Sequence, residues 1–227
     1  MTGEQKGMDL TAVPALGRED FIVSPANATA VASIEAWAGW PSGKLVLVGP
    51  KASGKSHLAG VWAGMTGARV VAAADLAQAD IAALAQGPVV VEDAAGRAGD
   101  GPAERALFHL HNLVLSNGHP LLITADAPPA RWPLALPDLA SRMQATATAE
   151  LHPPDDDLLG AVLVKLLSDR QVPIAPDVVR YAVERMDRRF AAVTALARAL
   201  NTWSFHRKGG LTKPLVREVL DKLRGDG

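Results

Sequence analysis

A glycine-rich segment of the sequence has the residue types and the spacing of a phosphate-binding loop. Gly49 and the run Gly54-Lys55-Ser56 match the pattern G-x-x-x-x-G-K-[ST], in which the glycines let successive backbone N–H groups point at an anion. Lys55 is expected to reach the β- and γ-phosphates of a nucleotide, and Ser56 to place its hydroxyl on Mg²⁺. The predicted nucleotide-binding residues are Gly49, Pro50, Lys51, Ala52, Ser53, Gly54, Lys55, Ser56 and His57.

A second group of candidate residues ends two apolar stretches further along the chain. One stretch ends in Glu92-Asp93 and the next in Thr124-Ala125-Asp126. Acids at the carboxyl end of a buried strand can hold Mg²⁺ and orient the attacking water. Acidic residues at strand ends are common in themselves, but the phosphate-loop motif upstream favours a functional role for these two acids. Glu92 is therefore a predicted Mg²⁺ ligand, and both acids are predicted catalytic residues. Asp126 is a candidate sensor of the γ-phosphate, with Thr124 as the alternative.

Apolar runs that alternate with helical periodicity must position these residues. Strands are predicted at 45–48, 69–73, 88–93, 120–126 and 145–151. The helical patterns between them imply parallel βαβ units with right-handed crossovers. The predicted fold class is α/β. Residues 21–152 are expected to form a three-layer domain with a five-stranded parallel sheet, after a flexible leader at 1–20 and before a small all-helical lid at 153–227.

Two of the predicted helices carry polar residues of interest. One is predicted from Asp75 to Ala85, with the aspartate as its N-cap. The other has an apolar face at 106, 107, 110, 113 and 114. His109 and His111 are both assigned to the surface of this helix, because no cysteine or carboxylate stands at metal-ligand spacing from them.

The composition narrows the class of protein. A hydrophobic content of 48% over 227 residues is sufficient for a packed core. No apolar run approaches the roughly 18 residues of a membrane helix, so no membrane association is expected. The absence of cysteine and of a secretory signal pattern favours a cytoplasmic protein. The formal net charge of −1 gives no basic footprint, so direct sequence-specific DNA binding is not expected.

The leader contains one distinctive segment. Residues 5–10 read Gln-Lys-Gly-Met-Asp-Leu, which would let an extended peptide bury two apolar side chains in a partner. This segment is similar to the Q-x-x-[LM]-x-[FL] peptides that bind the bacterial replication sliding clamp. Gln5, Met8 and Leu10 are therefore the predicted partner-binding residues.

Together, several segments resemble the AAA+ core of the DnaA family of bacterial replication initiators. The matches begin with Phe-Ile-Val-Ser-Pro-Ala-Asn at 21–27 and the histidine of Gly-Lys-Ser-His-Leu at 54–58. Leu-Pro-Asp-Leu-Ala-Ser-Arg-Met at 136–143 resembles the box with the family's arginine finger, which implies that Arg142 is presented to the ATP of a neighbouring subunit. The segment 185–190 resembles the lid segment whose arginine contacts the bound nucleotide, here best matched by Arg188, with Arg189 as the alternative.

DnaA continues into a helix-turn-helix domain after its lid, and we expect no such domain in this sequence. The sequence is thus most similar to the Hda (HdaA) type of DnaA-homologous regulator, which stimulates ATP hydrolysis by DnaA on the DNA-loaded sliding clamp. This resemblance implies ADP or ATP with Mg²⁺ as cofactors, and DnaA and the sliding clamp as partners. An exposed arginine finger also implies a surface for a neighbour, either DnaA or a second copy of this chain.

One departure from the family pattern bears on activity. The chain has Glu92-Asp93 where the wider AAA+ pattern has Asp-Glu and DnaA commonly has Asp-Asp. Because a misplacement of about 1 Å can cost two orders of magnitude in rate, we expect at most weak intrinsic ATPase activity. Three alternatives stay open: a stand-alone P-loop ATPase or small-molecule kinase, a helicase loader of the DnaC type, and a truncated DNA-binding initiator.

Overall fold

A parallel β-sheet forms the centre of the computed structural model, which describes residues 22–206 and 210–225. Its strands are β1 (Lys44–Val48), β2 (Arg69–Ala72), β3 (Val89–Glu92), β4 (Leu121–Ala125) and β5 (Thr148–Glu150). They lie in the order β2-β3-β4-β1-β5, and every neighbouring pair is parallel. The predicted α/β class with a five-stranded parallel sheet is therefore confirmed.

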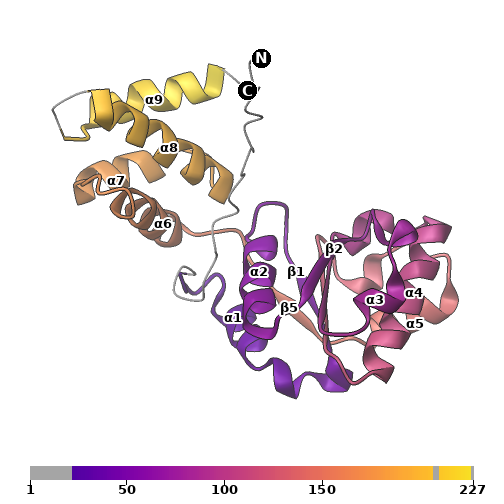
Figure 1. The fold of residues 1–227 in the computed structure, drawn as a ribbon. Helices are drawn as coiled ribbons and strands as arrows, with labels where there is room; N and C mark the ends of the chain where they lie inside the picture. The colour runs from indigo at the N-terminus through magenta and orange to yellow at the C-terminus, as the bar shows by residue number, and fades with distance from the viewer. Residues whose placement is uncertain (1–21, 207–209, 226–227) are drawn as a thin grey trace, which may run out of the picture.

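Helices cover both faces of the sheet, so its central strands are apolar on both sides. One face packs against α1 (Ala28–Glu35) and α2 (Lys55–Thr66), and the other against α4 (Gly101–Ser116) and α5 (Pro137–Gln144) (Figure 1). Strand β1 illustrates the alternation: Leu45 and Leu47 point to the α1 and α2 side, while Val46 and Val48 point to the α4 and α5 side. The predicted phosphate-binding loop thus follows a fully buried strand.

The single helix predicted from Asp75 to Ala85 is wrong. The structure has a 3-10 turn at Leu76–Gln78 and a separate short helix, α3 (Ile81–Leu84). Asp80 separates them, because its carboxylate accepts a hydrogen bond from the Ala83 N–H at 3.0 Å and caps α3. An aspartate side chain that bonds to nearby backbone N–H groups competes with continuous helix.

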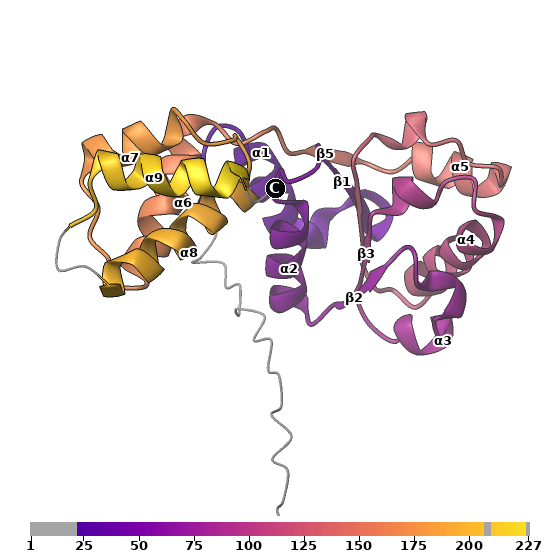
Figure 2. The same ribbon diagram turned by 90° about the horizontal axis from the view of Figure 1, so that it is seen from above.

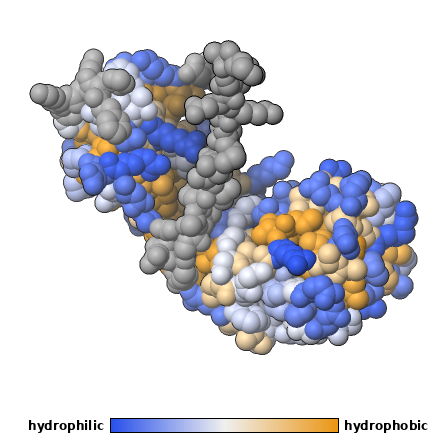
Figure 3. Space-filling model, in the orientation of Figure 1, coloured by the Kyte–Doolittle hydropathy of each residue, from blue (hydrophilic) through white to orange (hydrophobic). Residues whose placement is uncertain are grey.

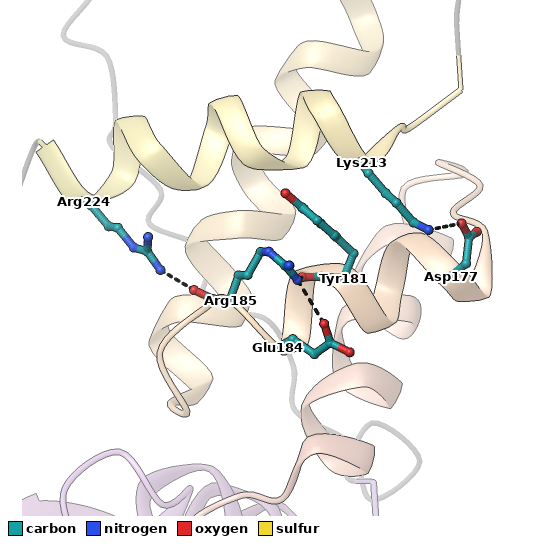
Figure 4. A network of polar contacts seen from close by, with 6 residues as sticks. All are labelled: Asp177, Tyr181, Glu184, Arg185, Lys213 and Arg224. Carbon is teal, nitrogen blue, oxygen red and sulfur yellow. Dashed lines mark hydrogen bonds and ion pairs between the residues drawn. The ribbon is translucent and has the colours of Figure 1, made fainter.

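A helical bundle follows β5 and has its own apolar core. It consists of α6 (Asp156–Ser168), α7 (Pro176–Val183), α8 (Phe190–His206) and α9 (Lys213–Gly225). Figure 4 shows how α9 is tied to α7 and the turn after it: Lys213 pairs with Asp177 at 2.7 Å, and Arg224 donates to the Arg185 carbonyl. These contacts are exposed, so most of the bundle's stability comes from its apolar core.

The bundle lies on the α2 side of the sheet in both ribbon views (Figures 1 and 2). Figure 3 shows a mixed surface on this face, with hydrophobic areas both on the helical bundle and over the edge strand β2, where Val70 is exposed. No helix in the described part of the chain is both long and apolar enough to cross a membrane.

Candidate nucleotide-binding site

The loop after β1 needs glycine at two positions for two different reasons. A Cβ added at Gly49 would lie 2.6 Å from the Ser53 Oγ and 2.8 Å from the Leu151 carbonyl oxygen, so no side chain fits there. Gly54 has φ +96°, in the left-handed region that favours glycine. The two motif glycines therefore allow the chain to close tightly on itself and then turn into α2.

The middle of the loop holds features typical of a ligand site. Ala52 has φ +63°, an uncommon conformation for a residue with a Cβ, and such strain clusters at ligand sites. The buried Ser53 Oγ has no hydrogen-bond partner among the described residues. Pro50 and Lys51 are exposed at the loop's tip. The loop thus combines an open surface with a polar group that its own fold does not satisfy.

Lys55 is held inside this loop. Its side chain is 7% exposed, and its Nζ donates to the carbonyls of Gly49 at 2.8 Å and Pro50 at 3.0 Å. Burial lowers the pKa of Lys55, although nearby acids oppose this shift. Both carbonyls belong to the loop itself, so phosphate oxygens can replace them as partners of the ammonium group.

The predicted acidic residues gather beside Lys55 at the carboxyl edge of the sheet. Asp93, Asp126 and Glu92 each favour the charged form of the lysine and so act to raise its pKa. The Asp93 N–H donates to the buried Thr124 Oγ1 at 3.1 Å, which joins the end of β3 to the end of β4. Asp93 itself has φ +56° and an exposed side chain. The chain thus brings together two strand ends that are far apart in sequence.

The start of α2 completes the site. Its N-cap, Gly54, supplies no capping side chain, so the positive end of the helix faces the loop. Ser56 is exposed in the first turn, and His57 is half-buried beside it. No group of three or more His, Cys, Asp or Glu that could hold a metal ion occurs among the described residues. The hydroxyl of Ser56 and the carboxylate of Glu92 are instead a small set of oxygen donors. Such a set suits Mg²⁺, which is commonly bound by one or two protein oxygens together with phosphates and water.

The bundle also contacts the loop. A Cβ at Gly54 would lie 3.3 Å from the Cε2 of Phe190, the first residue of α8. Arg188 stands two residues earlier and pairs with Asp156 at 3.0 Å, with both side chains exposed. Phe190 was missed as a loop contact in the sequence, although it directly follows the arginines at 188 and 189.

Arg142 lies beside the amino end of β1, whereas the predicted phosphate-binding loop follows the carboxyl end of that strand. It is exposed near the end of α5, with its guanidinium carbon 5.2 Å from the ring centroid of Phe108. Its carbonyl accepts from the Nζ of Lys44 at 3.0 Å. Lys44 begins β1, whereas the loop follows the last residue of that strand. These ends are about 13 Å apart at the rise of roughly 3.3 Å per strand residue, so the structure does not bring Arg142 to its own loop.

The prediction that His111 lies on a helix surface is wrong. The residue is 2% exposed, and its Nε2 lies 3.1 Å from the Lys44 Nζ while its Nδ1 lies 3.1 Å from the Asn112 Oδ1. An ammonium group can only donate, so we assign Nε2 as an acceptor and place the proton on Nδ1. Burial lowers the pKa of His111, the Asn112 contact opposes this, and the cations Lys44 and Arg142 add to the lowering. This polar cluster is therefore built around a neutral imidazole.

Comparison with known proteins identifies the fold. No family model matches the sequence. Domain III of the replication initiation protein DnaA from Thermotoga maritima is similar with a TM-score of 0.76 and 18% identity, over 92% of this chain and 97% of that one.

Two further structures agree. AMPPCP-bound DnaA from Aquifex aeolicus matches with a TM-score of 0.71 and 17% identity, over 85% of this chain and 67% of that one. The R170A form of RuvB from Thermotoga maritima matches with a TM-score of 0.68 and 16% identity, over 92% of this chain and 72% of that one. The chain therefore has an AAA+ fold of the kind found in domain III of DnaA.

Proposed function

We propose that this chain is a nucleotide-binding AAA+ regulator of replication initiation that stimulates ATP hydrolysis by DnaA through Arg142. One observation carries the proposal: Arg142 is exposed beside the amino end of β1, whereas the loop with the phosphate-binding sequence motif follows the carboxyl end of that strand. Because the two sites lie at opposite ends of β1, Arg142 does not reach the loop of its own chain. Its guanidinium is therefore suited to a nucleotide held by a neighbouring molecule.

The chemistry of such an arginine is electrostatic. A guanidinium supplied in trans offsets charge that develops on the transferred phosphoryl group, and arginine fingers raise rates by about 10³ to 10⁵. Arg142 keeps its side chain at the surface, against the ring of Phe108. This contact limits the conformations of the side chain before any neighbour arrives.

The chain's own site is proposed to bind ADP or ATP with Mg²⁺. Lys55 would donate to phosphate oxygens in place of the loop carbonyls, and Ser56 and Glu92 would hold Mg²⁺, which would help to neutralise the phosphate charge. Arg188 is the proposed lid contact, and Asp126 the proposed γ-phosphate sensor. The similarity to AMPPCP-bound DnaA supports nucleotide binding. Intrinsic hydrolysis is expected to be slow, because the order Glu92-Asp93 displaces both carboxylates from the usual AAA+ arrangement.

The sliding clamp is the second proposed partner. Gln5, Met8 and Leu10 form the candidate docking peptide, and they lie outside the described residues. The proposal therefore has its support in the sequence pattern of residues 5–10. A protein with these two partners acts in the bacterial cytoplasm, on DNA that the clamp already encircles.

The test is the rate of ATP hydrolysis by DnaA with this protein added, with and without DNA-loaded clamp. We expect clamp-dependent stimulation by the wild type, and its loss in both Gln5→Ala and Arg142→Ala. Arg170→Ala, which removes an exposed arginine in the turn after α6, is the matched control and should stimulate like the wild type.

Absence of stimulation under every condition would overturn this function. Binding to the replicative helicase in place of the clamp would then favour a helicase loader. Vigorous ATP turnover by the chain alone would favour a stand-alone ATPase, and phosphate transfer to a metabolite would favour a kinase. Sequence-specific binding to duplex DNA would favour a DNA-binding initiator.

A further inference from the structure

The helix that carries Arg142 is short and is held at both ends by buried charged groups. At its start, the carboxylate of Glu104 on α4 is 3% exposed. Its Oε1 accepts from the N–H groups of Gly99 at 2.6 Å and Ala135 at 3.0 Å, and its Oε2 from Ala135 at 3.1 Å and Leu136 at 2.8 Å. Leu136 is the N-cap of α5, so this carboxylate fixes where the helix begins.

At the end of α5, the carbonyl of Arg142 has two side-chain donors. The Nζ of Lys44 lies 3.0 Å away and the Oγ1 of Thr146 lies 2.8 Å away. The last carbonyls of a helix have no partner within the helix, so these contacts secure its final turn. Lys44 comes from β1, and it therefore anchors the backbone of Arg142 directly to the central sheet.

Helix α4 supplies the other partners of α5 from one of its faces. Glu104, Phe108 and His111 are spaced by four and three residues, which places them on the same side of a helix. Phe108 contacts the guanidinium of Arg142, and His111 accepts from Lys44. The arginine is thus fixed through its backbone by a buried lysine and through its side chain by an aromatic ring.

We propose that Glu104 and Lys44 are positioning residues for Arg142, which hold α5 so that its exposed guanidinium is in place before a neighbour's ATP arrives. This inference rests on the proposed function. Helix α5 has 8 residues, and helices shorter than about 12 residues are marginal without such support. A shift of about 1 Å in a group that acts on a reacting phosphate can cost two orders of magnitude.

Amide hydrogen exchange in the free protein tests whether Glu104 and Lys44 hold α5 in place. Glu104→Gln and Lys44→Met should each speed exchange of the amides of residues 140–144 by roughly 10-fold or more, because a locally opened helix loses protection. Strands β3 and β4 should keep their protection. Glu218→Gln and Lys222→Met, which alter an exposed pair on α9, are matched controls and should leave exchange at 140–144 unchanged. Wild-type protection of α5 in both positioning variants would overturn the proposal.

The rate of DnaA-catalysed ATP hydrolysis tests whether this positioning matters for the action of Arg142. The maximal stimulated rate should fall by about 10-fold or more in Lys44→Met, while the concentration that gives half-maximal stimulation stays within about twofold. Lys44→Arg, which keeps a cationic donor, should recover most of the rate.

Two results would contradict this role: a rise in the half-maximal concentration that accounts for the whole loss, or no recovery in Lys44→Arg. Wild-type stimulation by Arg142→Ala would instead overturn the proposed function and the functional role of the two residues. The exchange result would still decide whether Glu104 and Lys44 hold α5.

Discussion

Two buried lysines stand at opposite ends of the same stretch of chain, and their surroundings differ. Lys44 begins β1, and Lys55 begins α2, after the loop that follows β1. Each is 7% exposed, and burial lowers the pKa of each. Lys55 lies among acids that favour its charge, whereas Lys44 lies beside the cation Arg142, which lowers its pKa further.

The difference suggests separate roles: Lys55 is placed to bind a ligand, whereas Lys44 stabilises the packing of β1 against neighbouring helices. Both partners of Lys55 are carbonyls of an exposed glycine loop, so phosphate can replace them. The partners of Lys44 are the carbonyl of Arg142 in α5 and the buried imidazole of His111 in α4, so this lysine joins β1 to two helices. Burial and a lowered pKa alone would not distinguish the two; the nature of their acceptors does.

The largest expected effect concerns nucleotide affinity. Lys55→Met should weaken binding by about 100-fold, because it removes charge-assisted bonds to phosphate worth about 1.5 to 3 kcal/mol. Lys44→Met should leave affinity within about twofold, since it lies at the other edge of the sheet. Titration with a fluorescent ATP analogue measures both. Equal losses in the two variants would abolish the distinction between the lysines.

The next effect concerns stability at the Arg142 edge. Glu104→Gln should lower the free energy of unfolding by about 2 kcal/mol, because an amide NH₂ would face backbone N–H donors that the carboxylate now satisfies. Urea unfolding measures this change, and nucleotide affinity should stay at the wild-type value. The exposed control Glu218→Gln should shift stability by no more than about 0.5 kcal/mol. A similar cost in both variants would rule out a special role for the buried carboxylate.

The smallest expected effect is a dependence on pH. Because the folded pKa of His111 is lowered by burial, the unfolded chain takes up this proton first as the pH falls below about 6.5. The contribution of neutral His111 to stability is complete above that pH and is lost below it, by at most about 1.4 kcal/mol per pH unit.

His111→Gln keeps an acceptor for Lys44 without the titration, so the stability difference between wild type and variant should shrink as the pH falls. Unfolding curves at several pH values between about 5 and 8 would measure it. A constant difference would show that His111 does not titrate differently in the folded state.

The fold, and the grouping of polar residues at the carboxyl ends of the strands, could be predicted from local sequence patterns. The loop motif from Gly49 to Ser56 and the acids at 92–93 follow apolar strands, and parallel strands end at a common edge. Contact between sites far apart in sequence, such as the bond from Asp93 to Thr124, follows from that topology. The roles of the individual site residues remain predictions.

The cluster around Lys44 was not predicted, because its contacts join distant parts of the chain. His111 is four residues after Leu107 and three before Val114, so it falls within the apolar face of α4, and this spacing was the available signal of its burial. The partner that makes burial tolerable is 67 residues away, on β1. Glu104 likewise binds the segment before α5, and no local pattern indicates such a contact.

Arg142→Ala should separate two tasks that lie at opposite ends of β1, nucleotide binding at the loop and stimulation of DnaA at Arg142. We expect this variant to bind nucleotide with wild-type affinity and to lower the maximal stimulated rate of ATP hydrolysis by DnaA by about 10³-fold. Nucleotide affinity and stimulation are measured on the same preparation. Wild-type stimulation, or a loss of the variant's own nucleotide binding that matches the loss of stimulation, would show that Arg142 does not act on the nucleotide of a neighbour.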